Sequence, residues 1–279
     1  MAGFRFREPS IVPGFRLTFG FTILYLLLIV IIPIVGLYLR MFELDWDAFT
    51  AIVTGPRFVA ALRLSFGASA LAALFNVVIG VIVAWVLTRY DFPGRRLFDA
   101  VVDLPFALPT AVAGIALTTL YVPQGWIGSL FAPMGIRIAY TPIGIWIALV
   151  FIGLPFVVRT VQPVLQDFDR EFEEAAATLG ANRWQTITRI VFPTLVPAVL
   201  TGFALAFARA VGEYGSVIFI AGNLPRQTEI LPLLIVFRLE EFNYPAAAAI
   251  AAVMLTASFV VLLIVNLIQV WSQRRYGNA

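Results

Sequence analysis

The 279-residue sequence contains no cysteine and no histidine, and because it also lacks lysine, all 19 of its basic residues are arginine. Without cysteine there are no disulfides, thiolate metal ligands or thiol nucleophiles, and without histidine there is no imidazole ligand or histidine acid–base catalyst. A Walker-type phosphate-binding loop needs a lysine, so the chain cannot complete that loop either. These absences exclude most metal-binding and hydrolytic enzyme classes.

Charge is also scarce. Charged residues make up 13% of the chain and hydrophobic residues 61%, with a mean hydropathy of +0.94 and a formal net charge of +3. An ordinary soluble domain has about 25% charged residues, so this composition predicts an integral membrane protein, and its long apolar runs predict an all-α fold. The sequence pI near 9.5 reflects arginines spread between apolar runs, a pattern typical of membrane topology, and we expect no nucleic-acid partner.

Six apolar segments are long enough to be considered membrane spans, because a bilayer core of about 30 Å requires about 20 helical residues. The expected spans are residues 17–39, 60–88, 104–121, 138–160, 194–220 and 245–270. Prolines divide the uncharged stretch around the third span into one helix and a structured loop, and Gly153 with Pro155 predicts a kink or break near the end of the fourth. The first segment is too long for a signal-peptide core and is expected to stay in the protein.

Arginine placement predicts the orientation of these spans. With the N-terminus inside, the cytoplasmic side receives Arg5, Arg7, Arg16, Arg89, Arg95, Arg96, Arg159, Arg170, Arg183, Arg189, Arg274 and Arg275. The opposite side receives Arg40, Arg57, Arg137, Arg226 and Arg238. The positive-inside rule therefore predicts that both tails, residues 1–16 and 271–279, are cytoplasmic.

The loop between the fourth and fifth spans, residues 167–193, contains signals for two short helices. Asp169 is placed to cap the first, which has acidic residues in its opening turn, and Gly180 is placed to end it in a left-handed conformation. Asn182 and Gln185 have the spacing of a capping box for the second helix, and Pro193 is expected to end it.

The first loop helix has a narrow apolar stripe at helical spacing, formed by Phe172, Ala175, Ala176 and Leu179. One interpretation is a helix that lies on lipid headgroups. However, residues 167–174 hold five acids and one arginine, whereas an anionic leaflet attracts basic helices. The pattern therefore favours docking in a groove of a partner protein, with Phe172 and Leu179 as anchors.

The spacing in this loop closely resembles the EAA loop of permeases from binding-protein-dependent ABC importers. Glu174-Ala175-Ala176 is followed after three residues by Gly180, and Ile190 and Phe192-Pro193 follow at the spacing of that motif. Phe192 stands where the motif usually has leucine. The resemblance spans residues 58–270 and implies a type I importer permease of the MetI-like architecture, located in a bacterial-type plasma membrane.

The same resemblance implies that the loop helix couples this chain to an ATPase. The coupling residues it implies are Glu171, Phe172, Glu174, Ala175, Ala176, Leu179 and Gly180. It also implies that the chain itself is not an enzyme and binds no cofactor, and that two copies of a separate cytoplasmic ATPase use ATP and magnesium.

Two further stretches, Asp103–Leu117 and Ala208–Asn223, resemble sulfate/thiosulfate permeases of the CysT type, within a wider group for sulfate, molybdate and tungstate. The Arg-Ala-Val-Gly-Glu-Tyr-Gly run that begins at Arg209 carries most of this likeness. It implies a heterodimer with a W-type permease and delivery of the anion by a periplasmic sulfate-binding protein. Molybdate or tungstate remains the alternative substrate.

Arg209 is expected deep in the fifth span, about 21 Å along its axis, and Glu213 lies one turn later. The pair either locks the helix to a neighbour or presents Arg209 to the anion path, together with Ser216 and Thr110. Gly212 and Gly215 either permit close packing or form a bending point.

Asp99 and Asp103, beside Arg95 and Arg96, predict a cytoplasmic charge cluster. Two other function classes are alternatives, namely an anion channel or secondary transporter acting alone, and a membrane scaffold. The docking loop and the scarcity of acids in the spans disfavour the first, and six spans with broken helices exceed what a scaffold needs.

Overall fold

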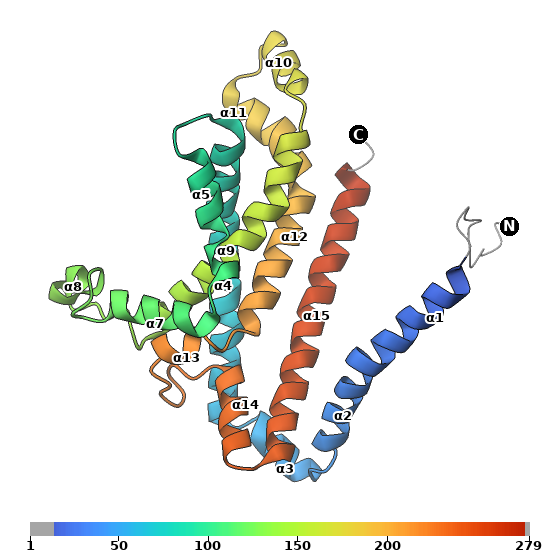
Figure 1. The fold of residues 1–279 in the computed structure, drawn as a ribbon, viewed down its shortest axis with the longest axis vertical. Helices are drawn as coiled ribbons and strands as arrows, with labels where there is room; N and C mark the ends of the chain where they lie inside the picture. Colours follow the sequence, from blue (N-terminus) through green and yellow to red (C-terminus); the bar gives the residue numbers. More distant parts are fainter. Residues whose placement is uncertain (1–13, 277–279) are drawn as a thin grey trace.

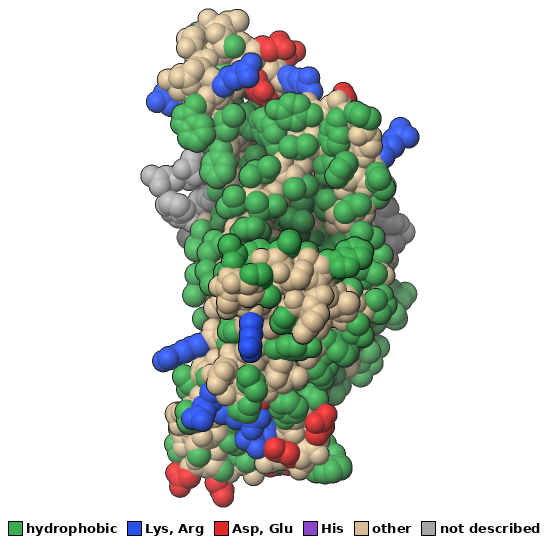
Figure 2. All heavy atoms as spheres, turned by 90° about the vertical axis from the view of Figure 1, so that its left-hand side faces the viewer, with side chains coloured by type: hydrophobic (Ala, Val, Ile, Leu, Met, Phe, Trp, Pro, Cys, Tyr) green, Lys and Arg blue, Asp and Glu red, His purple; other side chains and the backbone are tan. Residues whose placement is uncertain are grey.

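The computed structural model describes residues 14–276, without the side chains of Arg16 and of residues 271–276. These residues form helices and connecting turns, and no β-strand occurs among them. The helical stretches long and apolar enough to cross a membrane are Leu17–Met41, Pro56–Arg89, Pro142–Asp167, Arg183–Val211 and Tyr244–Val270. In Figure 2, charged side chains gather toward the two ends of the visible face and a hydrophobic band lies between them. The all-α membrane fold is therefore confirmed.

Three helices form the central bundle: α4 (Pro56–Arg89), α9 (Pro142–Asp167) and α12 (Phe192–Val211). Glycines allow their close approach, because a Cβ at Gly80 would lie 2.8 Å from the Val157 side chain and one at Gly202 would lie 2.9 Å from the Val157 Cα. Lipid offers no hydrophobic drive between helices, so small residues of this kind hold the bundle through close van der Waals contact.

The remaining long helices lie around this bundle. α15 (Tyr244–Tyr276) packs against α14 (Leu231–Glu240) and α12, and the Tyr38 hydroxyl of α2 (Ile32–Met41) lies 2.7 Å from Thr256 Oγ1 of α15. α1 (Phe15–Leu26) continues through a π-turn, Leu27–Ile31, into α2 and diverges from the bundle (Figure 1). α1 begins and α15 ends toward the same end of the molecule, whereas α3 (Trp46–Val53) lies at the other end (Figure 1).

The third expected span, 104–121, is wrong as a single helix. It consists of α6 (Leu104–Ala107) and α7 (Thr110–Tyr121), because Leu108, which precedes a proline, is extended. The 12 residues of α7 span about 18 Å, less than the bilayer core. α7 and the short α8 (Gly128–Phe131) project sideways from the bundle (Figure 1). Whether this broken segment completes a sixth crossing stays a prediction.

The fourth and fifth spans also have corrected bounds. α9 continues through Pro155 and Pro163 to Asp167, so the predicted break is not a helix end. The second loop helix, α11 (Arg183–Thr186), is continuous with α12 through a π-turn at Ile187–Val191. That wider turn accommodates Pro193, which therefore does not end the run. The helix ends at Val211 rather than near Ile220, and only the single turn α13 (Val217–Ile220) follows.

Candidate coupling surface and anion path

The expected loop helix is α10 (Glu171–Thr178), which lies with α11 at one tip of the molecule (Figure 1). Arg170, one residue later than expected, occupies the cap position, but Asp169 Oδ1 accepts a hydrogen bond of 3.0 Å from the Glu171 N–H. Glu171, Glu173 and Glu174 fill the first turn, where the helix dipole favours negative charge. Local chemistry therefore positions this helix much as the sequence predicts.

The predicted end of α10 and start of α11 are confirmed. Gly180 has a φ of +83°, and the Ala181 N–H donates to the Ala176 carbonyl at 3.0 Å, which closes the helix end. Asn182 Oδ1 accepts from the Gln185 N–H at 2.8 Å, and Gln185 Oε1 accepts from the Asn182 N–H at 2.9 Å, a complete capping box.

The apolar stripe on α10 divides between two directions. Ala176 is buried against the protein, whereas Ala175 and Phe172 are exposed and Leu179 is 88% exposed. Trp184 of α11 is also 73% exposed, and the sequence analysis did not single it out. The tip thus presents large apolar side chains beside the exposed acids Glu171 and Glu174, which is the composition of a surface that docks in a groove with a basic rim.

A further residue that the sequence analysis did not identify connects α10 to the bundle. Arg89, the last residue of α4, pairs with Glu173 at 2.6 Å. Its guanidinium also lies 5.5 Å from the Trp85 ring centre and 5.8 Å from that of Phe168. Nothing in the local sequence marks this pair, because the two residues belong to different helices.

The second candidate site surrounds the end of α12, where the expected ion pair between Arg209 and Glu213 is present. The Glu213 side chain is 2% exposed, and its Oε1 accepts hydrogen bonds from the Ser216 N–H at 2.8 Å and the Ser216 Oγ at 2.9 Å. The Arg209 side chain is 35% exposed. Glu213 therefore holds the turn after α12 and anchors Arg209 at the same time.

Thr110 and Gly215 meet in this site, and the two glycines have different surroundings. A Cβ at Gly215 would overlap Thr110 Oγ1, and one at Gly114 of α7 would overlap the Ser216 backbone. A Cβ at Gly212 would find its nearest atom, the Ala208 carbonyl oxygen, at 3.8 Å. Gly215 thus permits close packing of α7 on the turn, whereas Gly212 carries no such constraint.

Replacement of Gly215 with alanine is expected to destabilise the protein by about 1–3 kcal/mol, because the added methyl group meets Thr110. Gly212→Ala is the matched control and is expected to change stability by less than about 0.5 kcal/mol. Thr110→Ala in the Gly215→Ala background removes the overlapping hydroxyl and is expected to recover most of the loss. Thermal unfolding in detergent measures all three, and equal effects of the two glycine substitutions would contradict the packing described.

The expected charge cluster exists but is centred on a residue from another helix. Arg159 of α9 donates to both carboxylate oxygens of Asp103, at 2.8 and 2.6 Å, and to Asp99 Oδ1 of α5 (Arg95–Val102) at 2.7 Å. Burial opposes ionisation of Asp99, but hydrogen bonds from Arg159 and Gln162 outweigh it and hold the pKa of Asp99 below its usual value. The cluster fastens α5 to the central bundle.

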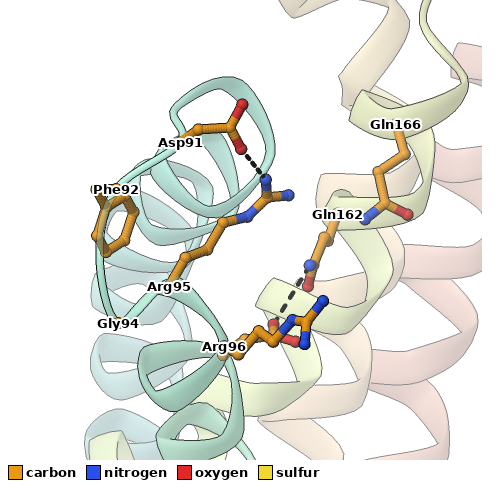
Figure 3. Close-up of a pocket in the computed structure, with 8 residues that line it drawn as sticks. Asp91, Phe92, Gly94, Arg95, Arg96, Gln162 and Gln166 are labelled. Atoms are coloured by element: carbon orange, nitrogen blue, oxygen red, sulfur yellow. Dashed lines mark hydrogen bonds and ion pairs between the residues drawn. The ribbon is translucent and has the colours of Figure 1, made fainter.

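A polar cavity of about 580 Å³ lies beside this cluster, between α5 and α9 (Figure 3). Arg95 is paired with Asp91 at 2.6 Å, and Arg96 extends toward Gln162 from the opposite wall. At the other end of the molecule, Arg57 of α4 forms a bidentate pair with the buried Glu229, at 2.8 and 2.6 Å. The sequence analysis predicted the charge cluster at Asp99 and Asp103 but not Arg159 as its centre, and it did not identify the Arg57 pair.

Among residues 14–276 no cluster of three or more metal-ligating side chains is present. The geometry instead combines exposed apolar and acidic side chains at one tip with a buried carboxylate and a partly exposed arginine at the end of α12. The sequence provides no ATP-hydrolysing motif.

Comparisons with known proteins agree with these features. Residues 76–278 match the family described as the binding-protein-dependent transport system inner membrane component. The sulfate transport system permease protein CysT of Synechocystis is 52% identical over 257 residues, covering 92% of this chain and 90% of that protein. The Escherichia coli protein of the same name is 47% identical over 266 residues, covering 95% and 96%.

Solved structures share the fold. A bacterial ABC transporter for the acidic polysaccharide alginate superimposes with a TM-score of 0.74 at 19% identity, covering 91% of this chain and 95% of that one. The methionine ABC transporter MetNI gives a TM-score of 0.58 at 16% identity, covering 77% and 96%. The chain therefore belongs to the binding-protein-dependent transport system inner membrane component family and is a multi-pass, pore-forming permease of an ABC importer in the plasma membrane, with ATP hydrolysis performed by a separate subunit.

Proposed function

We propose that this permease imports sulfate and thiosulfate. The observation that carries the proposal is its near-full-length similarity, at 47–52% identity, to relatives named sulfate transport permeases. Sulfate and thiosulfate are both tetrahedral dianions, and guanidinium donors are suited to such oxyanions. Molybdate and tungstate share that shape and are the competing substrates.

The proposed route for the anion passes Arg209. Glu213 engages one terminal nitrogen of its guanidinium, and within residues 14–276 no other hydrogen bond to this group is present, so donors remain for an oxyanion. Ser216 and Thr110 lie beside the pair, and Gly212 and Gly215 frame the turn that carries it. Glu213 compensates most of the arginine charge, so the anion is held weakly enough to leave.

The proposed coupling site is α10. Phe172 and Leu179 enter a groove of the ATPase, Glu171 and Glu174 pair with basic residues on its rim, Ala175 fits between them, and Ala176 with Gly180 fixes the helix in place. When two ATPase copies close on ATP and magnesium, the helix moves with them. The energetic link is a difference in docking between two ATPase states, because only differential binding shifts a conformational equilibrium.

The proposed assembly contains this chain, a W-type permease, two ATPase subunits and a periplasmic sulfate-binding protein, with both tails of this chain in the cytoplasm. The chain itself binds no cofactor. A structurally similar alginate transporter was solved in complex with a substrate-bound periplasmic protein, and that arrangement supports delivery of the anion by a soluble carrier.

The first test is purification of the chain from its native membrane in mild detergent, followed by identification of stoichiometric partners by mass spectrometry. We expect a single kind of ATPase subunit, in two copies, and a second permease. Reconstituted with the binding protein, the complex should take up radiolabelled sulfate only with ATP, and excess thiosulfate should compete at lower concentration than molybdate. Uptake by the chain alone without ATP would instead indicate a channel.

A further inference from the structure

Chain connectivity attaches α10 directly to only two of the three central helices. Through residues 168–170 it continues from α9, and through Gly180–Asn182 and α11 it leads into α12. Within residues 14–276, α11 is the helix that packs most closely against α10. α4 is the third central helix, and no backbone connection carries a movement of α10 to it.

The side chain of Arg89 provides a direct contact between α4 and α10, in addition to the packing of α4 against α9 and α12. It is the C-terminal residue of α4, its side chain is 10% exposed, and its ion pair with Glu173 reaches the first turn of α10. The Trp85 and Phe168 rings, 5.5 and 5.8 Å from the guanidinium carbon, restrict where that group can lie. A cation held by two rings and one carboxylate transmits position more firmly than an exposed, mobile ion pair would.

Other acids of α10 have a different environment. Glu171 and Glu174 are exposed and take part in no ion pair within the described part of the chain, whereas the Glu173 side chain is 31% exposed and points its carboxylate at α4. A cavity of about 520 Å³ lies beside Arg89, and Asp167, Asp169 and Arg170 line it together with Thr88, Leu165 and Phe168. The three acids in the first turn therefore divide into two that face outward and one that faces the bundle.

We propose that Arg89 and Glu173 form a clamp that makes α4 move with α10, so that the clamp is a positioning element for coupling. The inference rests on the proposed coupling role of α10. Arg89 contacts neither substrate nor ATP in this scheme, and its effect is exerted through the position of α10 relative to α4. Because the pair joins the ATPase-facing helix to the central bundle, its loss should separate ATP turnover from transport rather than abolish both.

Charge reversal tests the clamp in the complete transporter, reconstituted with its binding protein. Arg89→Glu and Glu173→Arg are each expected to keep ATP hydrolysis and to lower transport per ATP hydrolysed by about tenfold, within the range of allosteric coupling energies. Combined in one chain, the two reversals are expected to recover part of the lost transport per ATP. The ion pair is restored, but a glutamate at position 89 cannot replace the contacts of the Arg89 cation with the Trp85 and Phe168 rings. Arg40→Glu, which breaks an exposed pair with Glu43 at the other end, is the matched control and should leave the ratio unchanged.

A reversible cross-link provides a second test that does not depend on charge. Since the chain has no native cysteine, Arg89→Cys with Glu173→Cys creates the only thiols in it. We expect the free dithiol form to transport little substrate per ATP hydrolysed. Transport per ATP should recover when a short reagent joins the two thiols through disulfide bonds, and it should fall again when reduction removes this cross-link. Normal coupling in both single reversals, or a cross-link that blocks transport, would overturn the clamp.

Failure of the clamp and failure of the proposed coupling role give different results. If Leu179→Asp loses the ATPase while the position 89 and 173 variants couple normally, α10 is the coupling helix and the clamp is wrong. If Leu179→Asp also retains both the ATPase and normal transport, the coupling role itself is wrong.

Discussion

Replacement of Gly180 with valine is expected to leave ATP hydrolysis largely intact while it lowers transport about tenfold. Gly180 has a φ of +83°, a conformation that costs a β-branched residue about 1–3 kcal/mol. No atom lies within 4 Å of a Cβ built there, so the strain comes from the backbone alone. The C-terminal end of α10, which positions Leu179 toward the ATPase, would then shift. As a result α10 would dock equally well to the two ATPase states, and ATP hydrolysis would no longer drive transport. Parallel assays of ATP hydrolysis and sulfate uptake in proteoliposomes measure the effect.

Two matched controls separate local strain from loss of coupling. Gly180→Asn is expected to couple nearly normally, because asparagine tolerates the left-handed conformation. Gly135→Val introduces the same strain at a φ of +73° with equally open surroundings, in the loop between α8 and α9, and should spare coupling. Normal transport in Gly180→Val, or an equal defect in Gly135→Val, would remove the geometric reason for placing the coupling site here.

Glu213→Gln is expected to cause the largest loss of stability, about 3 kcal/mol, since it leaves the Arg209 charge in the last turn of α12 without its buried carboxylate partner. The amide oxygen of glutamine keeps an acceptor for the Ser216 N–H, so the change isolates the charge rather than the turn. Thermal unfolding of the purified complex measures this loss.

The double change Arg209→Met with Glu213→Gln is expected to recover most of that stability, because neither partner is then left as an uncompensated charge. If Arg209 also faces the anion, the stable double variant should still transport poorly, and uptake by this variant distinguishes a structural pair from a transport residue. A double variant with normal uptake would restrict the pair to a structural role.

The features that the sequence predicted well depend on neighbours in the chain. Gly180, the Asn182–Gln185 capping box and the Arg209–Glu213 pair each satisfy a backbone or charge requirement within four residues. Both partners of such a contact lie within a few residues of each other, so their spacing in the sequence is enough to predict the contact.

The features that escaped prediction connect distant parts of the chain. Arg159 and Asp103 are 56 positions apart and Arg57 and Glu229 are 172 apart, so only the folded bundle brings them together. The end of α12 at Val211 was not predicted, because the apolar residues Val217–Ile220 follow soon after it and extend the apolar segment. Gly212 and Gly215 are the sequence signal for the turn between the two helices. Pro109 indicates a break between α6 and α7, but the uncharged length of the segment favoured the prediction of a single helix.

Docking of a separate ATPase on α10 is tested most directly by single-cysteine cross-linking in the purified transporter, which is possible because the chain has no cysteine of its own. Leu179→Cys and Trp126→Cys place thiols where the native side chains are 88% and 87% exposed, the first at the α10 tip and the second before α8. We predict that a short thiol-to-amine reagent joins position 179, but not position 126, to the ATPase, and that ATP changes the yield. Equal yields at the two positions, or none at position 179, would contradict coupling through α10.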